Sequence, residues 1–227
     1  MLPFVVPTRG TVSWQELLAD PEKQWRTGYS ARSMAHCWEE SRGFPKCVQA
    51  VLQTADEPAL RDPELLIGIP EHQVPLPGGS RPSQTDLWVL ARAGDDLISI
   101  AVEGKVSEAF GPTIDEWLVE ASGGKRQRLA FLHERLGLKA PVPGEIRYQL
   151  LHRTASALIE AERFGARHAL MLVHSFSQSC EWLEDYQKFA SLYGTEAQAG
   201  QIVTCRSVDG IQLSLGWATG DARWLSA

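Results

Sequence analysis

The 227-residue sequence has no apolar run of the length that a transmembrane helix needs, and it has few cysteines. The N-terminal stretch MLPFVVPTRG lacks the basic region and the long apolar segment of a signal peptide. We therefore expect a cytoplasmic protein without membrane contact. The cysteines lie far apart and form no CxxC pair, so we expect reduced, mostly buried thiols and neither a zinc site nor a disulfide framework; they are Cys37, Cys47, Cys180 and Cys205.

Basic residues are also fewer than acidic residues. Lysine and arginine number 22 against 28 aspartates and glutamates, giving a net charge of −6. This balance argues against a protein that coats nucleic acid nonspecifically, because such a protein normally has a basic surface. It is compatible with a local basic groove around an acidic centre. The chain has no internal repeat and no low-complexity segment, and its length suits a single domain over residues 1–227.

The first half of the sequence begins with helical patterns and then changes to strands. Ser13 and Glu16 have capping-box spacing, a second helix is expected at 31–41, and a third after Pro45. Residues 65–69 are typical of a short apolar strand, followed by a Pro- and Gly-rich connection over 70–82.

The second half contains a long helix followed by an apolar strand. Thr113 and Glu116 form a second capping-box pattern, and amphipathic spacing predicts helices over 125–136 and 146–164. The stretch 168–176 is apolar throughout, as in a strand covered on both faces. A helix at 181–193 and a hairpin that turns at Asp209-Gly210 follow. This order predicts an α/β (α+β) fold with a central mixed sheet flanked by helices.

Residues 85–105, TDLWVLARAGDDLISIAVEGK, predict a hairpin with a two-residue Gly94-Asp95 turn. That turn places Asp86 directly opposite Glu103, with Cβ atoms about 4.5–5.5 Å apart. Lys105 lies two residues beyond Glu103 and therefore points to the same face. The opposite face of the hairpin is apolar, so the register is well specified.

Two adjacent carboxylates repel each other, and a divalent cation or a shared proton relieves that repulsion. Carboxylate oxygens in this arrangement suit Mg²⁺ or Mn²⁺. A lysine beside such a site can orient an attacking water and stabilise charge on a phosphoryl group. The alternative is a solvent-exposed ion pair at the rim of the sheet. The hairpin alone leaves both interpretations open.

The segments SQTD (83–86) and VEGK (102–105) resemble the D-(x)n-(D/E)-x-K signature of the PD-(D/E)xK nuclease superfamily, the restriction-endonuclease-like proteins. The core of that superfamily has the order helix, three antiparallel strands, helix, strand. The elements expected over residues 46–176 match this αβββαβ order, with a helix near 46–54, strands near 65–75, 86–92 and 97–105, the helix 146–164 and a strand at 168–175. An N-terminal helical extension (1–45) and a C-terminal helix and hairpin (177–227) lie outside it. Thr85 stands where the signature usually has proline.

The resemblance implies roles for particular residues. Asp86, Glu103 and the backbone carbonyl of Gly104 would bind Mg²⁺ or Mn²⁺, and Lys105 would be the catalytic lysine. Glu71, on the Pro-rich segment, would be an additional upstream acid. Gln149, on the long helix, matches the place where some branches carry an active-site glutamine. We interpret its neighbours on that helix, His152 and Arg153, as part of a solvated polar stripe.

The function implied by the resemblance is metal-dependent phosphodiester hydrolysis of DNA or RNA. Two alternatives stay open: an inactive interaction module that keeps the nuclease-like scaffold, and a metal-dependent hydrolase of a small phosphorylated substrate. A homodimer is compatible with either enzyme, because many enzymes that act on duplexes are symmetric dimers. The sequence does not distinguish DNA from RNA or endonuclease from exonuclease.

Overall fold

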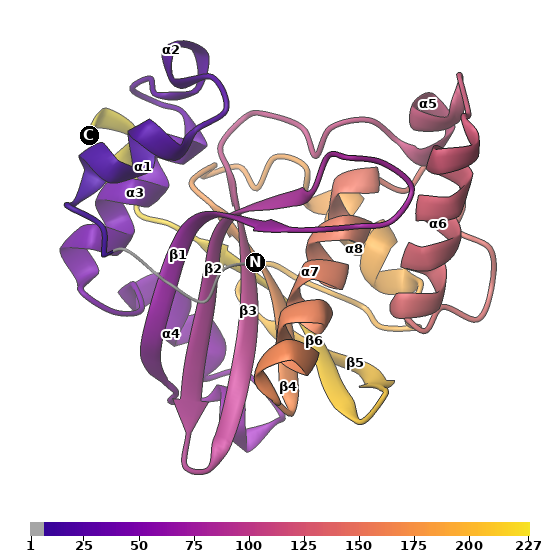
Figure 1. The fold of residues 1–227 in the computed structure, drawn as a ribbon. Helices are drawn as coiled ribbons and strands as arrows, with labels where there is room; N and C mark the ends of the chain where they lie inside the picture. Colours follow the sequence, from indigo (N-terminus) through magenta and orange to yellow (C-terminus); the bar gives the residue numbers. More distant parts are fainter. Residues whose placement is uncertain (1–6) are drawn as a thin grey trace.

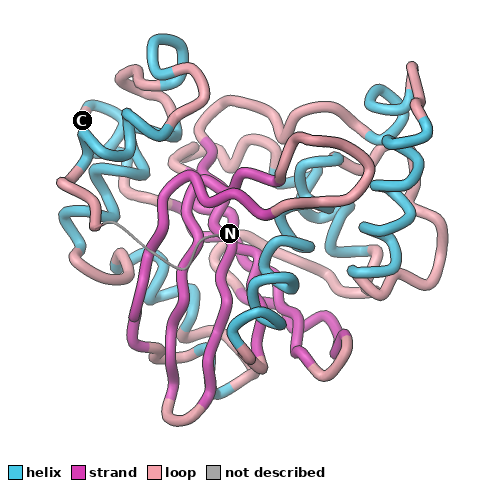
Figure 2. Tube along the Cα trace, viewed as in Figure 1, coloured by secondary structure: helices cyan, strands magenta, loops and turns pink. Residues whose placement is uncertain are grey.

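The computed structural model describes residues 7–227 and consists of one six-stranded sheet with helices on both faces (Figure 1, Figure 2). Residues 1–6, which contain much of the segment considered for a signal peptide, lie outside the described residues. The strands are β1 (Glu64–Val74), β2 (Ser83–Ala93), β3 (Asp96–Lys105), β4 (His168–Ser175), β5 (Ile202–Val208) and β6 (Ile211–Thr219).

The sheet is mixed, as predicted. Its strand order is β1-β2-β3-β4-β6-β5. The first three strands are antiparallel neighbours, β4 runs parallel to both β3 and β6, and β5 closes the other edge antiparallel to β6. The parallel β3–β4 pair requires a crossover, and the long helix between them supplies it.

The helices divide between the two faces of the sheet. On one face, α7 (Tyr148–Phe164) packs across β2, β3 and β4. On the other face lie α3 (Ser30–Ser41) and α4 (Lys46–Leu52). Figure 1 shows the N-terminal helices in indigo on the left and α5 to α8 on the right. The remaining helices are α1 (Thr11–Leu17), α2 (Pro21–Gln24), α5 (Ile114–Leu118), α6 (Gly123–Arg135), α8 (Leu183–Ser191) and the 3₁₀ turns η1 (Pro58–Leu60) and η2 (Ala222–Ser226).

The β2–β3 hairpin has the predicted register. Ala93 pairs with Asp96 at the turn, and Leu87 pairs with Val102 near the open end. The ladder ends at this pair, and Asp86 and Glu103 are the residues directly beyond it. The apolar face of the hairpin is buried against the layer that contains α3 and α4. Trp88, on the other face, stacks on a ring of α7 at 5.1 Å between centroids. The alternation of the sequence therefore sorts the hairpin residues between two cores.

The first strand is longer than the apolar run 65–69 and agrees with the strand near 65–75 that the resemblance implies. β1 continues to Val74, and Pro70 pairs with Leu87 inside the ladder. Proline is tolerated here because β1 is an edge strand, so one side of its backbone needs no partner. The extension includes Glu71, which lies between the pairs Pro70–Leu87 and His72–Thr85 of the ladder.

The two capping-box predictions had different outcomes. Thr113 and Glu116 form the reciprocal pair at the start of α5, as predicted. Ser13 does not cap a helix, because α1 already begins at Thr11. The hydroxyl of Ser13 instead accepts a hydrogen bond from the backbone N–H of Arg9 at 2.8 Å. The order of the predicted elements is otherwise retained, and the short helix α2 is additional to it.

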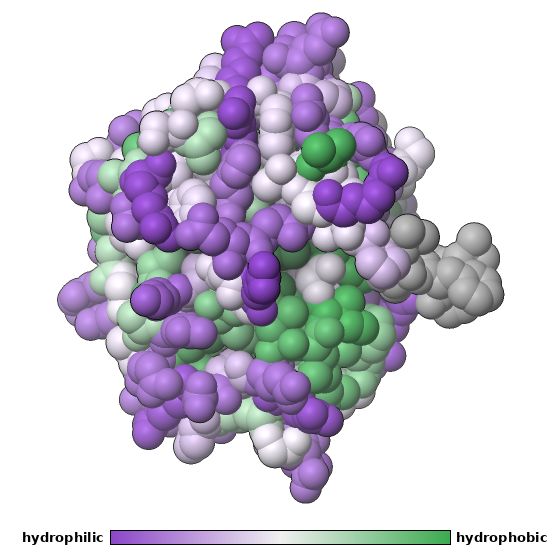
Figure 3. All heavy atoms as spheres, turned by 90° about the vertical axis from the view of Figure 1, so that its left-hand side faces the viewer, coloured by the Kyte–Doolittle hydropathy of each residue, from purple (hydrophilic) through white to green (hydrophobic). Residues whose placement is uncertain are grey.

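The edge strand β1 carries two exposed apolar side chains, Leu66 and Ile67. Figure 3 turns the side of the molecule that includes β1 toward the viewer and shows an apolar area surrounded by polar residues. Within residues 7–227, none of the helices is both long enough and apolar enough to cross a membrane.

Candidate functional site

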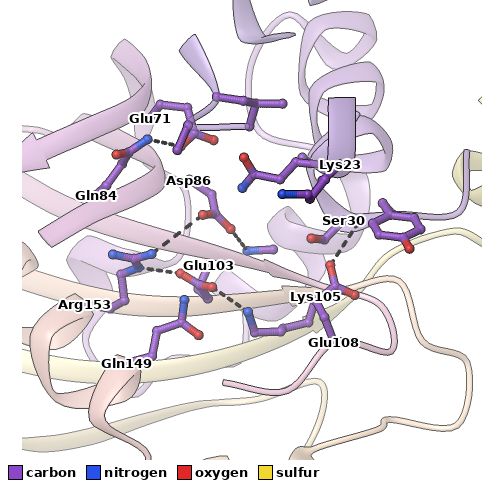
Figure 4. Close-up of a pocket in the computed structure, with 16 residues that line it drawn as sticks. Lys23, Ser30, Glu71, Gln84, Asp86, Glu103, Lys105, Glu108, Gln149 and Arg153 are labelled. Atoms are coloured by element: carbon purple, nitrogen blue, oxygen red, sulfur yellow. Dashed lines mark hydrogen bonds and ion pairs between the residues drawn. The ribbon is translucent and has the colours of Figure 1, made fainter. Parts of the chain in front are cut away.

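A cavity of about 520 Å³ lies at the end of the sheet where the first helices, β1 to β3 and α7 meet. It brings together all the side chains that the sequence nominated: Glu71, Asp86, Glu103, Lys105 and Gln149. Figure 4 shows the polar side chains that line it and their contacts. Its other lining residues are Leu18, Ala19, Lys23, Gln24, Tyr29, Ser30, Ala31, Gln84, Gly104, Glu108 and Arg153.

Glu103 lies between two cations. Its Oε1 accepts a hydrogen bond from Lys105 Nζ at 2.6 Å, and its Oε2 accepts one from Arg153 Nε at 2.5 Å. All three side chains are at least nine-tenths buried. Burial alone would raise the pKa of Glu103, but the charges of Arg153 and Lys105 outweigh it and hold the pKa below its usual value. Glu103 is therefore a carboxylate whose charge is compensated inside the protein.

The negative charge of Asp86 is compensated less completely than that of Glu103. Its Oδ2 accepts a hydrogen bond from the backbone N–H of Gly104 at 2.8 Å, and its Oδ1 lies 3.9 Å from Arg153 Nη2. A quarter of the side chain is exposed, toward the cavity. Burial and the neighbouring charge of Glu103 raise the pKa of Asp86 to about 7. The Arg153 cation thus lies near Asp86 Oδ1 but beyond hydrogen-bond distance.

Glu71 adds a third carboxyl group from the edge strand. Its Oε2 accepts a hydrogen bond from Gln84 Nε2 at 2.7 Å. Burial and the charge of Asp86 raise the pKa of Glu71 to about 8. The backbone at Glu71 has a φ of 52°, an uncommon conformation for a residue other than glycine, asparagine or aspartate. Such local strain is often found at functional sites.

Gly104 separates the two charged residues at the end of β3. The Lys105 carbonyl accepts a hydrogen bond from Phe176 N–H, on the β4 side of β3. Successive carbonyls along a strand point in opposite directions, so the Gly104 carbonyl points toward β2 and Asp86. A Cβ atom at position 104 would lie 3.0 Å from Met34 Sδ and 3.3 Å from Asp86 Oδ2. Glycine therefore lets α3 pack closely against the strand that carries the site.

Gln149 projects from the first turn of α7 into the cavity. Its Oε1 atom is buried and accepts no hydrogen bond from the described part of the chain. An unpaired buried carbonyl is costly, and most such groups in proteins have a partner. This oxygen is consequently an unused acceptor on the wall of the cavity.

The oxygen atoms that line the cavity are of the chemical types that bind a hard divalent cation. Glu71 and Asp86 are desolvated carboxylates that repel one another, and the Gly104 carbonyl and Gln149 Oε1 are neutral oxygen donors. A cation would relieve the repulsion between the carboxylates. Within residues 7–227, however, no three His, Cys, Asp or Glu side chains are arranged as a metal site. Both oxygens of Glu103 are engaged by cations, so Glu103 is the weakest of the expected ligands as it stands.

The structure contradicts the interpretation of Arg153 as one residue of a polar stripe that faces solvent. It is buried and bridges Glu103, Asp86 and the hydroxyl of Ser83, which lies 3.3 Å from Nη1. Gln149 and Arg153 are four residues apart, so they share one face of α7. This spacing could have indicated from the sequence that Arg153 belongs to the same site as Gln149. Neighbouring His152 contacts the same hydroxyl on β2, with Nδ1 at 2.8 Å from Ser83 Oγ.

The N-terminal helices also contribute side chains to the site. Because they lie outside the expected nuclease-like core, the sequence did not suggest this contribution. Lys23 of α2 and Ser30 of α3 line the cavity. Glu108 follows β3 and accepts from the backbone N–H groups of Ser30 and Val106 at 3.1 and 3.0 Å. These contacts fix the start of α3 over the end of β3. No local pattern in residues 1–45 could have revealed a contact with a segment so distant in sequence.

Residues 7–222 match the family described as "Domain of unknown function (DUF6946)". The chain belongs to this family. No curated protein and no solved structure matches the chain. The family match includes the N-terminal helices and the C-terminal hairpin, so the whole cavity lies within the DUF6946 domain.

Proposed function

We propose that this DUF6946 protein is a Mg²⁺- or Mn²⁺-dependent phosphodiesterase of the PD-(D/E)xK type that cleaves DNA or RNA. The observation that carries the proposal is the meeting of Asp86, Glu103 and Lys105 in one cavity, with the Gly104 carbonyl directed toward Asp86. Their arrangement on two antiparallel strands corresponds to the signature that the sequence resembles. The order of α4, β1 to β3, α7 and β4 also supports a restriction-endonuclease-like core.

In this proposal, the residues of the cavity have distinct roles. Asp86, Glu103 and the Gly104 carbonyl would hold the metal ion, with Glu71 and Gln149 Oε1 as additional oxygen donors. When bound, the ion polarises the phosphoryl group and lowers the pKa of water. Lys105 orients the attacking water and stabilises negative charge on the phosphoryl oxygens. Arg153 keeps Glu103 ionised and holds its carboxylate in place.

The shape of the cavity favours a second candidate, the hydrolysis of a small phosphorylated substrate. The first three helices cover one side of the cavity, and Lys23 and Tyr29 line it. A cavity of about 520 Å³ has the size of a small-molecule site. The same chemistry would act on a nucleotide or on the end of a single strand. An inactive interaction module is the third candidate, and the engagement of both Glu103 oxygens by cations favours it.

Cleavage assays with purified protein separate these candidates. Labelled single-stranded and double-stranded DNA, single-stranded RNA and a chromogenic phosphodiester are incubated with Mg²⁺ or Mn²⁺. A nuclease degrades a polynucleotide, a small-substrate hydrolase cleaves only the chromogenic ester, and an interaction module cleaves none of them. Asp86→Asn and Lys105→Met should abolish any true activity. Lys139→Met, at an exposed position outside the cavity, is the control for charge removal.

The cellular context follows from the proposed activity. We propose a cytoplasmic location, where nucleic acids and nucleotides are available, and retain the homodimer as a prediction. Sedimentation equilibrium of the wild-type protein with and without duplex DNA tests the dimer.

A further inference from the structure

A second cluster of reactive side chains lies on the other face of the sheet. Cys37 and Trp38 of α3, Cys47 of α4 and His174 of β4 meet there. The two cysteines line a cavity of about 940 Å³ that shares no lining residue with the cavity around Asp86. Cys37 and His174 are buried, whereas Cys47 is partly exposed. The expectation that the cysteines are mostly buried is therefore wrong, since only Cys37 is.

The hydrogen bonds fix the position of the proton on His174. The indole Nε1–H of Trp38 donates to His174 Nδ1 at 3.1 Å, and an indole nitrogen can only donate. His174 Nδ1 is therefore the acceptor nitrogen, and the ring proton is on Nε2. Nε2 lies 3.3 Å from Cys47 Sγ. Nε2–H consequently donates to the sulfur of Cys47, as it would to a thiolate.

Cys37 is a second neighbour of the same sulfur. Its interaction with Cys47 raises the pKa of the Cys37 thiol, and together with the contact to His174 it lowers the pKa of Cys47 to about 4, against the effect of burial. The contact with His174 Nε2–H and the neighbouring Cys37 thiol therefore both favour the thiolate form of Cys47.

The charged groups around this cluster come from three elements. Glu40 of α3 and Arg223 of η2 form an ion pair at 3.1 Å, and Lys46 of α4 and Asp221 also line the cavity. In the described chain, neither these residues nor Cys37, Cys47 and His174 form a three-ligand arrangement suited to a metal. The reactive atom of the cluster is the Cys47 sulfur, which His174 Nε2 contacts at 3.3 Å.

We propose that Cys47 is a nucleophilic, redox-sensitive thiolate that reacts with peroxides entering this cavity, and that Cys37 is its resolving thiol. The Cys47 sulfur attacks one oxygen of the peroxide, the O–O bond breaks, and the products are Cys47 sulfenic acid and hydroxide (or an alkoxide). The Cys37 thiol then attacks the sulfenic sulfur, a disulfide forms and water leaves. Two electrons pass from the cysteine pair to the peroxide, and a dithiol reductant returns them.

The location of the pair suggests what its oxidation would affect. Helix α3 carries Cys37 in its second turn and Ser30, which lines the cavity around Asp86, at its start. A Cys37–Cys47 bond would therefore act on the helix that covers the candidate active site. The reactivity of Cys47 itself does not depend on the activity proposed for that site.

Alkylation kinetics test the thiolate directly. Wild-type protein is treated with iodoacetamide between pH 5.5 and 8.5, and modification of each cysteine is followed by peptide mass spectrometry. The Cys47 rate should change less than about threefold over this range, because a thiolate is present throughout. Cys205 is the internal control: burial raises its pKa to about 12, so its rate should fall about tenfold per pH unit on acidification. A Cys47 rate that falls in parallel with that of Cys205 would overturn the proposal.

Peroxide treatment tests the role of Cys37. One equivalent of hydrogen peroxide should give a Cys37–Cys47 disulfide in the wild-type protein, mapped without reduction. In Cys37→Ser the sulfenic acid should persist on Cys47 and be captured by dimedone, and in Cys205→Ser the disulfide should still form. A wild-type protein whose Cys47 is left unmodified, or is captured by dimedone as readily as in Cys37→Ser, contradicts the assignment.

Discussion

Arg153 on the long helix α7 donates to Oε2 of Glu103 on β3 at 2.5 Å, and its other arm lies 3.9 Å from Asp86. Both Arg153 and Glu103 are nearly inaccessible to solvent. The guanidinium thus connects the helix to the two acidic residues that the hairpin brings together. This contact makes the candidate site part of the packing between α7 and the sheet.

Loss of Arg153 should destabilise the fold. Arg153→Met leaves Glu103 buried with one cation instead of two, and breaking a buried ion pair typically costs about 3–5 kcal/mol of unfolding free energy. The double variant Arg153→Met/Glu103→Gln should recover part of this loss, because the buried negative charge is removed as well. Urea denaturation of the single and double variants measures the coupling.

The exposed ion pair between Arg167 and Asp96, at 2.9 Å, provides the control for this measurement. Arg167→Met should cost less than about 1 kcal/mol, since its side chain is largely exposed. Equal costs for Arg153→Met and Arg167→Met would show that Arg153 is not an internal partner of Glu103.

Asp86→Asn should stabilise the protein at high pH and have little effect at low pH. The folded-state pKa of Asp86, about 7, lies above its ordinary value of 3.8, so the folded protein retains a proton that the unfolded chain releases. The stability that Asp86 contributes is therefore present below about pH 4 and is lost as the pH rises through 7. The melting temperature of Asp86→Asn relative to wild type should rise between pH 5 and pH 8.

Two further variants define this pH effect. Glu71→Gln should behave in the same way up to about pH 8, the raised pKa of that carboxyl group. Asp62→Asn, at an exposed position outside the cavity, is the control for the loss of a surface carboxyl group. A difference in melting temperature for Asp86→Asn that does not change with pH would contradict the assigned pKa shift.

Gln149→Met should separate stability from activity. The buried Oε1 of Gln149 lacks a partner, so its removal should leave the free energy of unfolding unchanged or raise it by about 1 kcal/mol. Metal-dependent cleavage should nevertheless fall, because an oxygen on the cavity wall is lost. Gln187→Met is the contrast: the Gln187 amide donates to the Ala197 carbonyl at 2.9 Å, and its loss should destabilise the fold.

Lys105→Met should reduce cleavage by at least about a hundredfold, the usual cost of removing one group that stabilises transition-state charge. The variant should be destabilised, because Glu103 keeps one buried cation, Arg153, instead of two, but it should stay folded. Circular dichroism and single-turnover cleavage measure the two effects separately. Unchanged cleavage by a folded Lys105→Met protein would remove Lys105 from the mechanism.

Much of this site could be predicted because its geometry is local. The Gly94-Asp95 turn and the alternation of apolar residues determine the register, so the positions of Asp86, Glu103 and Lys105 on one face followed from 21 consecutive residues. The mixed sheet followed from the order of strands and helices. The Pro-containing end of β1 did not follow from the apolar pattern alone, because the tolerance of proline there depends on β1 being an edge strand.

The parts of the site that depend on distant contacts could not be predicted. Arg153 looked like one of several polar residues on an amphipathic helix, and its partner Glu103 is 50 residues away. The approach of α3 to Gly104 and the meeting of Cys47 with His174 depend on the way the N-terminal helices pack against the sheet. No periodicity or spacing contains that information.

The central claim, that the oxygens around Asp86 bind a divalent cation, is tested most directly by titrating Mn²⁺ into the protein at pH 6.5. Calorimetry in two buffers of different ionisation enthalpy measures both the binding and the protons released. We predict one site in the wild-type protein, release of about one to two protons per ion as Asp86 and Glu71 ionise, and loss of binding in Asp86→Asn. Absence of binding, or binding that Asp86→Asn leaves unchanged, would contradict the account.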